Sequence, residues 1–130
     1  MRVATCRCGS LRAECTQEPV RVSVCHCVEC QRRTGSAFSA QARFPAESVN
    51  VAGEFSTFVR TADSGHNLTY QFCPSCGSTV AYQIDAWPEV VAVPLGAFEE
   101  ADLPAPAYSI YERRKFPWVG ITNDEVEHHS

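Results

Sequence analysis

Eight cysteines in a chain of 130 residues constrain the fold more than any other feature, because seven of them lie in three tight groups. The groups are Cys6-Arg7-Cys8-Gly9, Cys25-His26-Cys27-Val28-Glu29-Cys30 and Cys73-Pro74-Ser75-Cys76-Gly77, and Cys15 stands alone. A disulfide framework spreads its cysteines so that they close long loops. Cysteines two or three residues apart can instead present two thiolates to one ion. The spacing therefore favours metal sites over disulfides.

The N-terminus and the composition narrow the class of protein. The segment Met1-Arg2-Val3-Ala4-Thr5-Cys6 lacks the apolar core of an export signal, so we expect a cytoplasmic protein, and disulfides are rare in that compartment. No apolar run approaches the roughly 18 residues of a membrane span. A net charge of −4 argues against a basic face for nucleic acid. Hydrophobic residues make up 45% and charged residues 20% of the chain, which is typical of a globular domain.

Short alternating segments predict a mainly β fold. Apolar residues recur at every second position over 11–15, 20–24, 38–44, 68–72 and 80–84, and an apolar run covers 90–93. We expect antiparallel sheets with few short helices, namely two turns over 27–34 ended by Gly35 and one turn over 45–48. The length fits a single domain over 1–130, with a core over 1–123 and a frayed polar tail over 124–130.

The first and last cysteine pairs suit a closed structural site. Glycine follows Cys76 and can adopt positive φ, which frees backbone N–H groups to face the thiolates. Cys6 and Cys8 project to one face of a strand. Together with Cys73 and Cys76 they supply the four sulfurs of a tetrahedral zinc site. Metal bound there would tie the N-terminus to the middle of the chain and stabilise a small core.

The central motif leaves three sulfurs, those of Cys25, Cys27 and Cys30. Three ligands fill only three positions of a tetrahedron, so a second zinc ion there would keep one position for water or substrate, as catalytic zinc sites do. The alternative is that a fourth protein ligand closes this site too. His26 stands between two ligands, so we expect its side chain to point away from their metal.

The remaining candidates for metal binding have simpler expected roles. Cys15 belongs to an alternating strand, and we expect a small buried side chain. His66 follows a Ser-Gly loop and should be exposed to solvent. His128 and His129 lie in the tail, where no role is expected.

The three motifs, taken in order, resemble the glutathione-dependent formaldehyde-activating enzyme family, which includes a centromere protein. The resemblance rests on the Cys-x-Cys-Gly, Cys-His-Cys-x-x-Cys-x-x-x-Thr-Gly and Phe-Cys-Pro-x-Cys-Gly motifs and extends over about residues 2–120, including Ile110-Tyr111-Glu112-Arg113-Arg114-Lys115-Phe116-Pro117-Trp118. It implies an Mss4-like fold, a structural zinc on the four paired cysteines and a catalytic zinc on the central three. It also implies a carbon–sulfur lyase activity that joins glutathione and formaldehyde into S-(hydroxymethyl)glutathione. A homodimer is a further candidate state.

The charge of a zinc ion bound by three thiolates, and the soft character of these ligands, favour thiol chemistry at the central motif. Zn²⁺ held by three thiolates carries a formal charge of −1, so it should be a weak Lewis acid for making hydroxide from water. Thiolate ligands suit a soft incoming sulfur. We therefore expect the free position to hold a small-molecule thiol, which would then attack a small aldehyde. The alternative is a non-catalytic zinc-binding module in which both metals are structural or buffered.

Substrate contacts are expected from the residues that follow the central motif. Arg32 and Arg33 could balance the negative charge of a bound thiolate, although both could equally be solvated. Thr34 and Gly35 could donate hydrogen bonds to a carboxylate of glutathione. Further along, Tyr111 and Trp118 are expected in the core or in the wall of a pocket, and no general base stands out, since Glu29 on a solvated turn is the commoner arrangement.

Overall fold

Strands dominate the computed structural model, which describes all residues from 1 to 130. The strands are β1 (Arg2–Thr5), β2 (Arg12–Cys15), β3 (Arg21–Cys25), β4 (Ser39–Pro45), β5 (Val49–Ala52), β6 (Ser56–Thr61), β7 (Asn67–Phe72), β8 (Thr79–Ile84), β9 (Val90–Pro94), β10 (Tyr108–Ile110) and β11 (Glu127–His128). The α-helix is α1 (Val28–Thr34), and single 3₁₀ turns cover Ala46–Ser48, Leu95–Ala97 and Glu112–Arg114. The mainly β expectation is confirmed, and none of the helices is long and apolar enough to cross a membrane.

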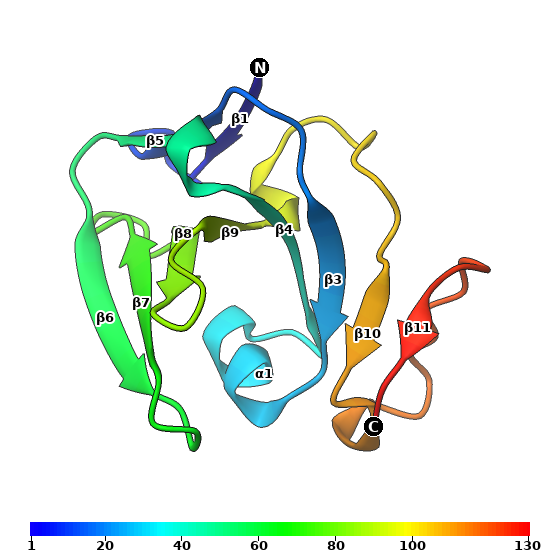
Figure 1. The fold of residues 1–130 in the computed structure, drawn as a ribbon. Coiled ribbons are helices and arrows are strands. Elements are labelled where there is room, and N and C mark those ends of the chain that lie inside the picture. The colour runs from blue at the N-terminus through cyan, green and yellow to red at the C-terminus, as the bar shows by residue number, and fades with distance from the viewer.

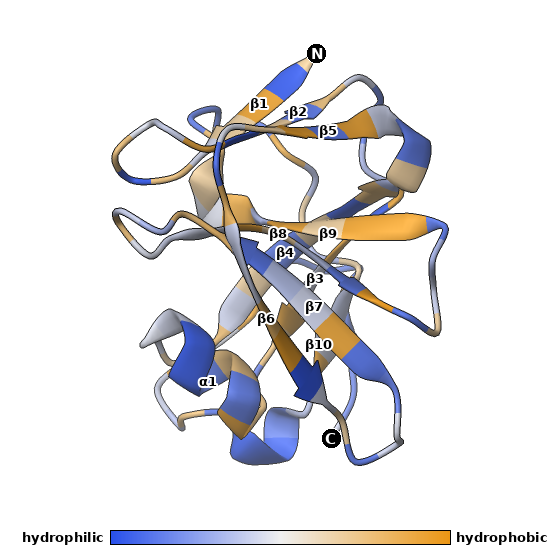
Figure 2. Cartoon of the chain, turned by 90° about the vertical axis from the view of Figure 1, so that its left-hand side faces the viewer, coloured by the Kyte–Doolittle hydropathy of each residue, from blue (hydrophilic) through white to orange (hydrophobic).

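The strands form a small sheet and a large one. The small sheet has the order β1-β2-β5, and the large sheet has the order β11-β10-β3-β4-β9-β8-β7-β6. The large sheet curls around α1, which lies between β6–β7 on one side and β3–β10 on the other (Figure 1). The small sheet and α1 lie at opposite ends of the molecule (Figure 2). The large sheet therefore lies between the small sheet at one end and α1 at the other.

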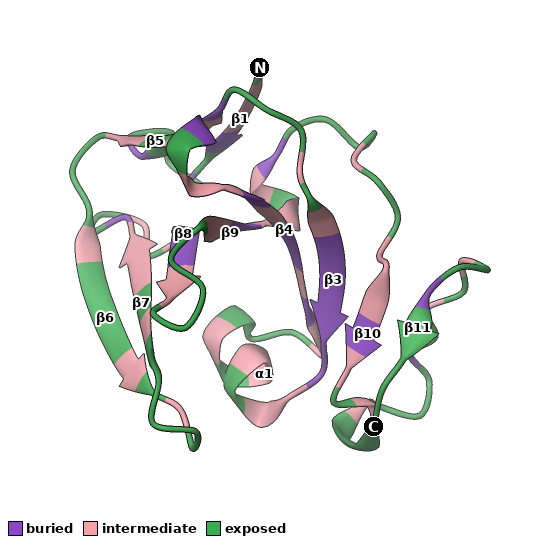
Figure 3. Ribbon diagram, in the orientation of Figure 1, coloured by how far each residue is buried: buried purple, intermediate pink, exposed green.

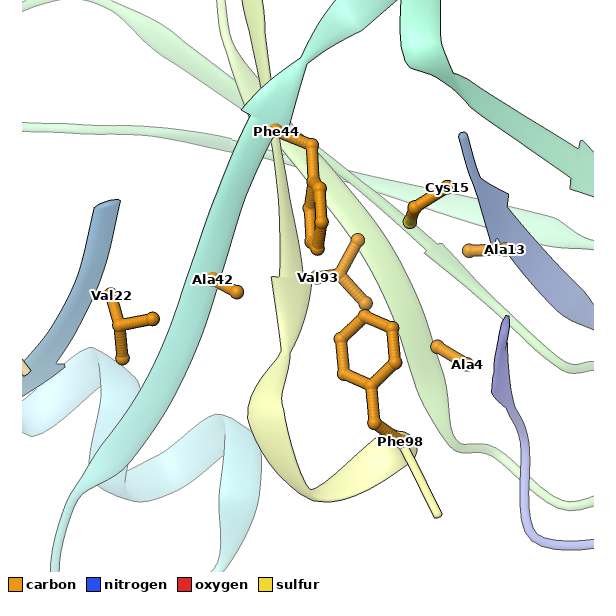
Figure 4. Packing of buried hydrophobic residues seen from close by; sticks show 8 residues of the cluster. All are labelled: Ala4, Ala13, Cys15, Val22, Ala42, Phe44, Val93 and Phe98. Carbon is orange, nitrogen blue, oxygen red and sulfur yellow. The ribbon is translucent and has the colours of Figure 1, made fainter. Parts of the chain in front are cut away.

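The hydrophobic core lies between the two sheets. Phe44 of β4 and Phe98 meet with ring centroids 5.8 Å apart, and Val93 packs beside them. Small side chains of the other sheet, Ala4 and Ala13 among them, face these rings (Figure 4). A large ring opposite an alanine lets the two sheets approach closely without voids. Cys15 is fully buried in this cluster, as expected from its alternating strand.

The opposite face of β3 and β4 is polar and is nevertheless buried. Antiparallel register brings three pairs of residues together on this face, Arg21 with Arg43, Ser23 with Gln41 and Cys25 with Ser39. The second and third pairs are buried, as the purple of β3 shows, whereas the two arginines are half-buried (Figure 3). Alternation sends the valines of β3 toward the core, so Cys25 must point to the α1 side. The fold thereby places one cysteine of the central motif on this polar face of the sheet, which is turned toward α1.

The C-terminal segment differs from the expectation in two respects. It is not frayed, because Val126 is buried and β11 pairs with β10, and His129 N–H donates to the carbonyl of Ser109 over 2.8 Å. The sheet is also not wholly antiparallel, since β10 runs parallel to both β3 and β11. The polar sequence of 124–130 conceals this strand because two residues are too few to show an alternating pattern.

Gly53 holds the end of β5 against the loop between β1 and β2. Its φ is +113°, and a Cβ there would collide with the carbonyl oxygen of Ser10 and lie 3.2 Å from Leu11 Cα. We expect Gly53→Ala to lower the free energy of unfolding by at least about 2 kcal/mol, measured by urea denaturation. Gly65→Ala is the matched control, because Gly65 has φ +91° with open space around it and should lose only about 1 kcal/mol. Equal losses in the two variants would contradict the close approach.

Candidate metal centre

Four cysteines from two distant loops converge beside the small sheet. Cys6 and Cys8 follow β1, and Cys73 and Cys76 lie between β7 and β8. All four sulfurs lie within 4.8 Å of one another, and the Sγ–Sγ distance is 3.6 Å from Cys6 to Cys8 and 3.7 Å from Cys8 to Cys73. Tetrahedral zinc with Zn–S bonds of about 2.3 Å places its sulfurs about 3.8 Å apart. The donor set and its spacing therefore fit a metal such as zinc.

Hydrogen bonds hold the two loops of this four-cysteine cluster and shift the pKa values of its thiols. The N–H of Leu11 points to Cys6 Sγ at 3.2 Å, and Gly77, at φ +80°, donates its N–H to the carbonyl of Cys73 at 2.8 Å. A hydrogen bond from the Ser78 hydroxyl lowers the pKa of Cys76 to about 5. Thiolates are the form that binds metal, so the surroundings of Cys76 favour its ligand state before any ion arrives. Hydrogen bonds with Ser10 lower the pKa of Cys8, but contacts with the thiols of Cys6 and Cys73 outweigh them, so this pKa is instead raised.

The second cluster consists of Cys25, Cys27 and Cys30, whose sulfurs also lie within 4.8 Å of one another. Cys25 ends β3, and Cys27 is the N-cap of α1, where its Sγ accepts a hydrogen bond from Cys30 N–H at 3.3 Å. Thiols of Cys25 and Cys30 hold the pKa of Cys27 down, while the same contact raises that of Cys25. Three sulfurs this close cannot all ionise without a cation among them. This three-cysteine cluster is therefore chemically suited to a metal.

The three-cysteine cluster has no fourth histidine, cysteine or carboxylate ligand. His26 is fully buried and turns away, since its Nε2 lies 2.9 Å from Ser109 Oγ on β10. Its backbone N–H also donates to Ile110 at 3.1 Å, which fixes the start of the cysteine loop to β10. His26 thus orients the loop without joining the cluster, as expected. A tetrahedral ion on this cluster would keep one position without a protein ligand.

Positive charge surrounds the three-cysteine cluster. Ser23 Oγ accepts hydrogen bonds at 2.8 Å from Arg43 Nη1 and from Gln41 Nε2, so the half-buried guanidinium is held on the cysteine side of the sheet. Burial lowers the pKa of Arg43, and the nearby charges of Cys25 and Cys30 act in the opposite sense. A half-buried cation beside clustered thiolates offsets part of their repulsion.

Arg33 approaches from the last turn of α1. Its guanidinium lies 4.9 Å from the ring centroid of Tyr82 and 5.8 Å from that of Tyr70. The two tyrosine rings are themselves 5.2 Å apart. Stacking on two rings restricts this long side chain to one position. Its Nη2 is buried without a hydrogen-bond partner.

Two cavities meet at Arg33 and Thr79. The hydroxyl cavity, of about 490 Å³, is lined by Thr5, Arg7, Arg33, Thr34, Phe38, Ser39, Ala40, Ser78, Thr79, Pro94, Gly96 and Ala97. The aromatic cavity, of about 460 Å³, is lined by Glu29, Arg32, Arg33, Phe58, Arg60, Tyr70, Phe72, Gly77 and Thr79. The first offers hydroxyls and two arginines, whereas the second combines aromatic rings with three arginines. They present different chemistry on either side of one guanidinium.

The expected substrate contacts are divided between these cavities. Arg33 and Thr34 line the hydroxyl cavity, Arg32 lines the aromatic one, and Gly35 lines neither, because it is the left-handed C-cap of α1 at φ +67°. The expectation for Tyr111 and Trp118 is wrong. Both are exposed, Trp118 by 75%, and neither lines these cavities.

Several residues that lie near the cysteines in the structure are not indicated as site residues by the sequence. Arg43, Arg60, Tyr70 and Tyr82 come from strands far from the central motif in sequence and reach it only because the sheet curls. The sequence does indicate the direction of Arg7. This residue lies between the two expected metal ligands Cys6 and Cys8, so its side chain must point away from their metal. Arg43 occupies a polar position of an alternating segment, a pattern that normally indicates a side chain in solvent.

Comparison with known proteins gives one family and one fold. The family model described as glutathione-dependent formaldehyde-activating enzyme matches residues 1–114. A search of curated proteins found no match. Among solved structures, the crystal structure of a Rhodobacter sphaeroides protein is similar with a TM-score of 0.60 at 20% sequence identity, covering 77% of this chain and 90% of that chain. At that identity, the likeness shows the fold alone.

Proposed function

Since the chain belongs to the glutathione-dependent formaldehyde-activating enzyme family, we propose that it is a zinc-dependent enzyme of the carbon–sulfur lyase type, with an Mss4-like fold, which joins glutathione to formaldehyde. The observation that carries this proposal is the cluster of three cysteines without a fourth protein ligand. Its cysteines do not themselves line the two cavities, but residues of the same helix, Arg32 and Arg33 among them, do. A closed four-cysteine site would leave no position for a substrate.

We assign one zinc ion to each of the two cysteine clusters, with a different role for each ion. Zinc on Cys6, Cys8, Cys73 and Cys76 is structural, because it joins the β1–β2 loop to the β7–β8 loop. Zinc on Cys25, Cys27 and Cys30 supplies, when bound, a soft position that stabilises a substrate thiolate. The reaction adds the thiol S–H across the formaldehyde C=O: an S–C bond forms, the π bond breaks and the proton goes to oxygen. No other reactant is needed.

The chain's own residues would balance charge and orient the thiol. A thiolate added to three cysteine thiolates and Zn²⁺ gives a net charge of −2. Arg43, which interacts with the charges of Cys25 and Cys30, would offset part of it, and Arg33 on α1 would add a second positive charge. The hydroxyl cavity suits the peptide part of glutathione, because Arg7 and Arg33 can bind carboxylates and the neighbouring hydroxyls can bind peptide groups. Ser39 lines this cavity and, by register, stands opposite Cys25.

The proposal is tested by equilibrium binding of glutathione to the zinc-loaded protein, followed by NMR detection of S-(hydroxymethyl)glutathione on addition of formaldehyde. We expect one thiol per chain and adduct formation faster than in buffer by at least about 100-fold. Absence of thiol binding by protein that holds two zinc ions would overturn the proposal. It would favour the alternative of a non-catalytic zinc-binding module.

A further inference from the structure

The aromatic cavity is not explained by glutathione or by formaldehyde. Formaldehyde has two heavy atoms and fills little more than the roughly 30 Å³ of a water molecule, whereas this cavity measures about 460 Å³. Glutathione is polar along its length and is better matched by the hydroxyl cavity on the other side of Arg33. The aromatic cavity therefore has space and chemistry that the two named substrates leave unused.

The charged side chains that line the aromatic cavity favour an anionic ligand. Arg32, Arg33 and Arg60 line it together with a single acidic residue, Glu29, and none of the three arginines forms an ion pair. Arg33 Nη2 and Arg60 Nε are buried without hydrogen-bond partners. A buried N–H without a partner costs about 1–3 kcal/mol, which a ligand oxygen can recover. Two such groups from different elements, α1 and β6, border one cavity.

The walls of the same cavity are aromatic. Phe58 comes from β6, and Tyr70 and Phe72 come from β7. Phe58 is 60% exposed although it is a large apolar side chain, and much of β6 is exposed at the free edge of the sheet (Figure 3). Rings that border an open cavity offer stacking and apolar contact to a flat ligand. An anion with a polar body would leave these rings uncovered.

We propose that the aromatic cavity binds an aromatic carboxylate, and that an aromatic aldehyde carrying such a carboxylate is a further carbonyl substrate of this protein, besides formaldehyde. This inference rests on the proposed function for the thiol partner. The carboxylate would be held by Arg33 and Arg60, and the ring would lie against Phe58 and Phe72. The thiol S–H then adds across the aldehyde C=O with the same balance of atoms as for formaldehyde, giving a hemithioacetal. Arg33 borders both cavities and so stands between the two substrates.

The test measures binding before it measures reaction. Benzoate is titrated into the full-length zinc-loaded chain by calorimetry, with acetate as the anion without a ring and benzyl alcohol as the ring without an anion. We expect saturable 1:1 binding of benzoate, and binding of each control ligand weaker by at least about tenfold. Arg60→Ala should weaken benzoate binding by about 10–100-fold and Phe58→Ala by about fivefold. Arg113→Ala, on an exposed turn outside the cavity, should not change it.

The outcomes separate this inference from the proposed function. Absent saturation by benzoate, or equal affinity in wild type and both cavity variants, overturns the inference even if glutathione and formaldehyde are joined. A further measurement compares 4-carboxybenzaldehyde with benzaldehyde in the presence of glutathione. Faster hemithioacetal formation with the carboxylated aldehyde, lost in Arg60→Ala, supports the substrate assignment. Equal rates for the two aldehydes overturn it.

Discussion

Cys76→Ser is expected to lower the melting temperature by more than about 15 °C, and to leave the protein largely unfolded once its metal is lost. The reason is that the four-cysteine cluster joins two loops that otherwise share only a small buried apolar cluster, in which Leu11 packs with Val80 and Ala81. The N–H of Arg7, for example, reaches the Ser78 hydroxyl only at 3.3 Å. The free energy of binding a structural metal contributes directly to the free energy of folding in such a small domain. Loss of one ligand should therefore destabilise the whole domain. Thermal unfolding followed by circular dichroism measures the effect.

Cys15→Ala is the matched control for this experiment. Cys15 is fully buried in the core but belongs to neither cluster. Its truncation removes one sulfur from a packed core and should lower the melting temperature by no more than about 8 °C. A melting temperature of Cys76→Ser within a few degrees of this control would show that the four-cysteine cluster does not stabilise the fold.

The second large effect is expected on function instead of stability. Cys27→Ser should keep the fold, with a melting temperature within about 5 °C of wild type, and should weaken glutathione binding and adduct formation by at least about 100-fold. Cys27 lies at the start of α1, where the serine hydroxyl can replace its Sγ as the acceptor for Cys30 N–H. The helix can thus survive while the metal site is lost. Calorimetric binding of glutathione and the melting temperature are measured on the same sample.

The same variant distinguishes the alternative function. If both metals are structural, Cys27→Ser should be destabilised as strongly as Cys76→Ser. A stable variant that binds glutathione as well as wild type would instead show that the three-cysteine cluster takes no part in thiol binding. Cys15→Ala again controls for the loss of a thiol unrelated to metal.

Cysteine spacing and apolar alternation predicted much of the fold because both are local signals. The helix that begins after Cys27 and ends at Gly35, and the strands that carry Val22 and Phe44, follow directly from residues a few positions apart. The two clusters could also be predicted, since each motif brings its own sulfurs together before tertiary structure is considered.

The surroundings of the cysteines could not be predicted in the same way. Gln41 and Ser39 occupy the polar positions of an alternating strand, a pattern that normally indicates solvent, yet both are buried on the α1 side of a curled sheet. Arg60 reaches the aromatic cavity from an edge strand that has no alternation to reveal it. Curvature and strand order arise from long-range packing, and a single sequence does not display them.

In the proposed function, the cluster of Cys25, Cys27 and Cys30 holds a metal with one position left for a substrate thiol. This role is tested most directly by measuring zinc per chain by elemental analysis on the same samples that are titrated with glutathione. We expect about two zinc ions and one bound thiol per chain for wild type, and about one zinc ion and no bound thiol for Cys27→Ser. One zinc ion per wild-type chain, or two zinc ions with no thiol bound, would contradict this role.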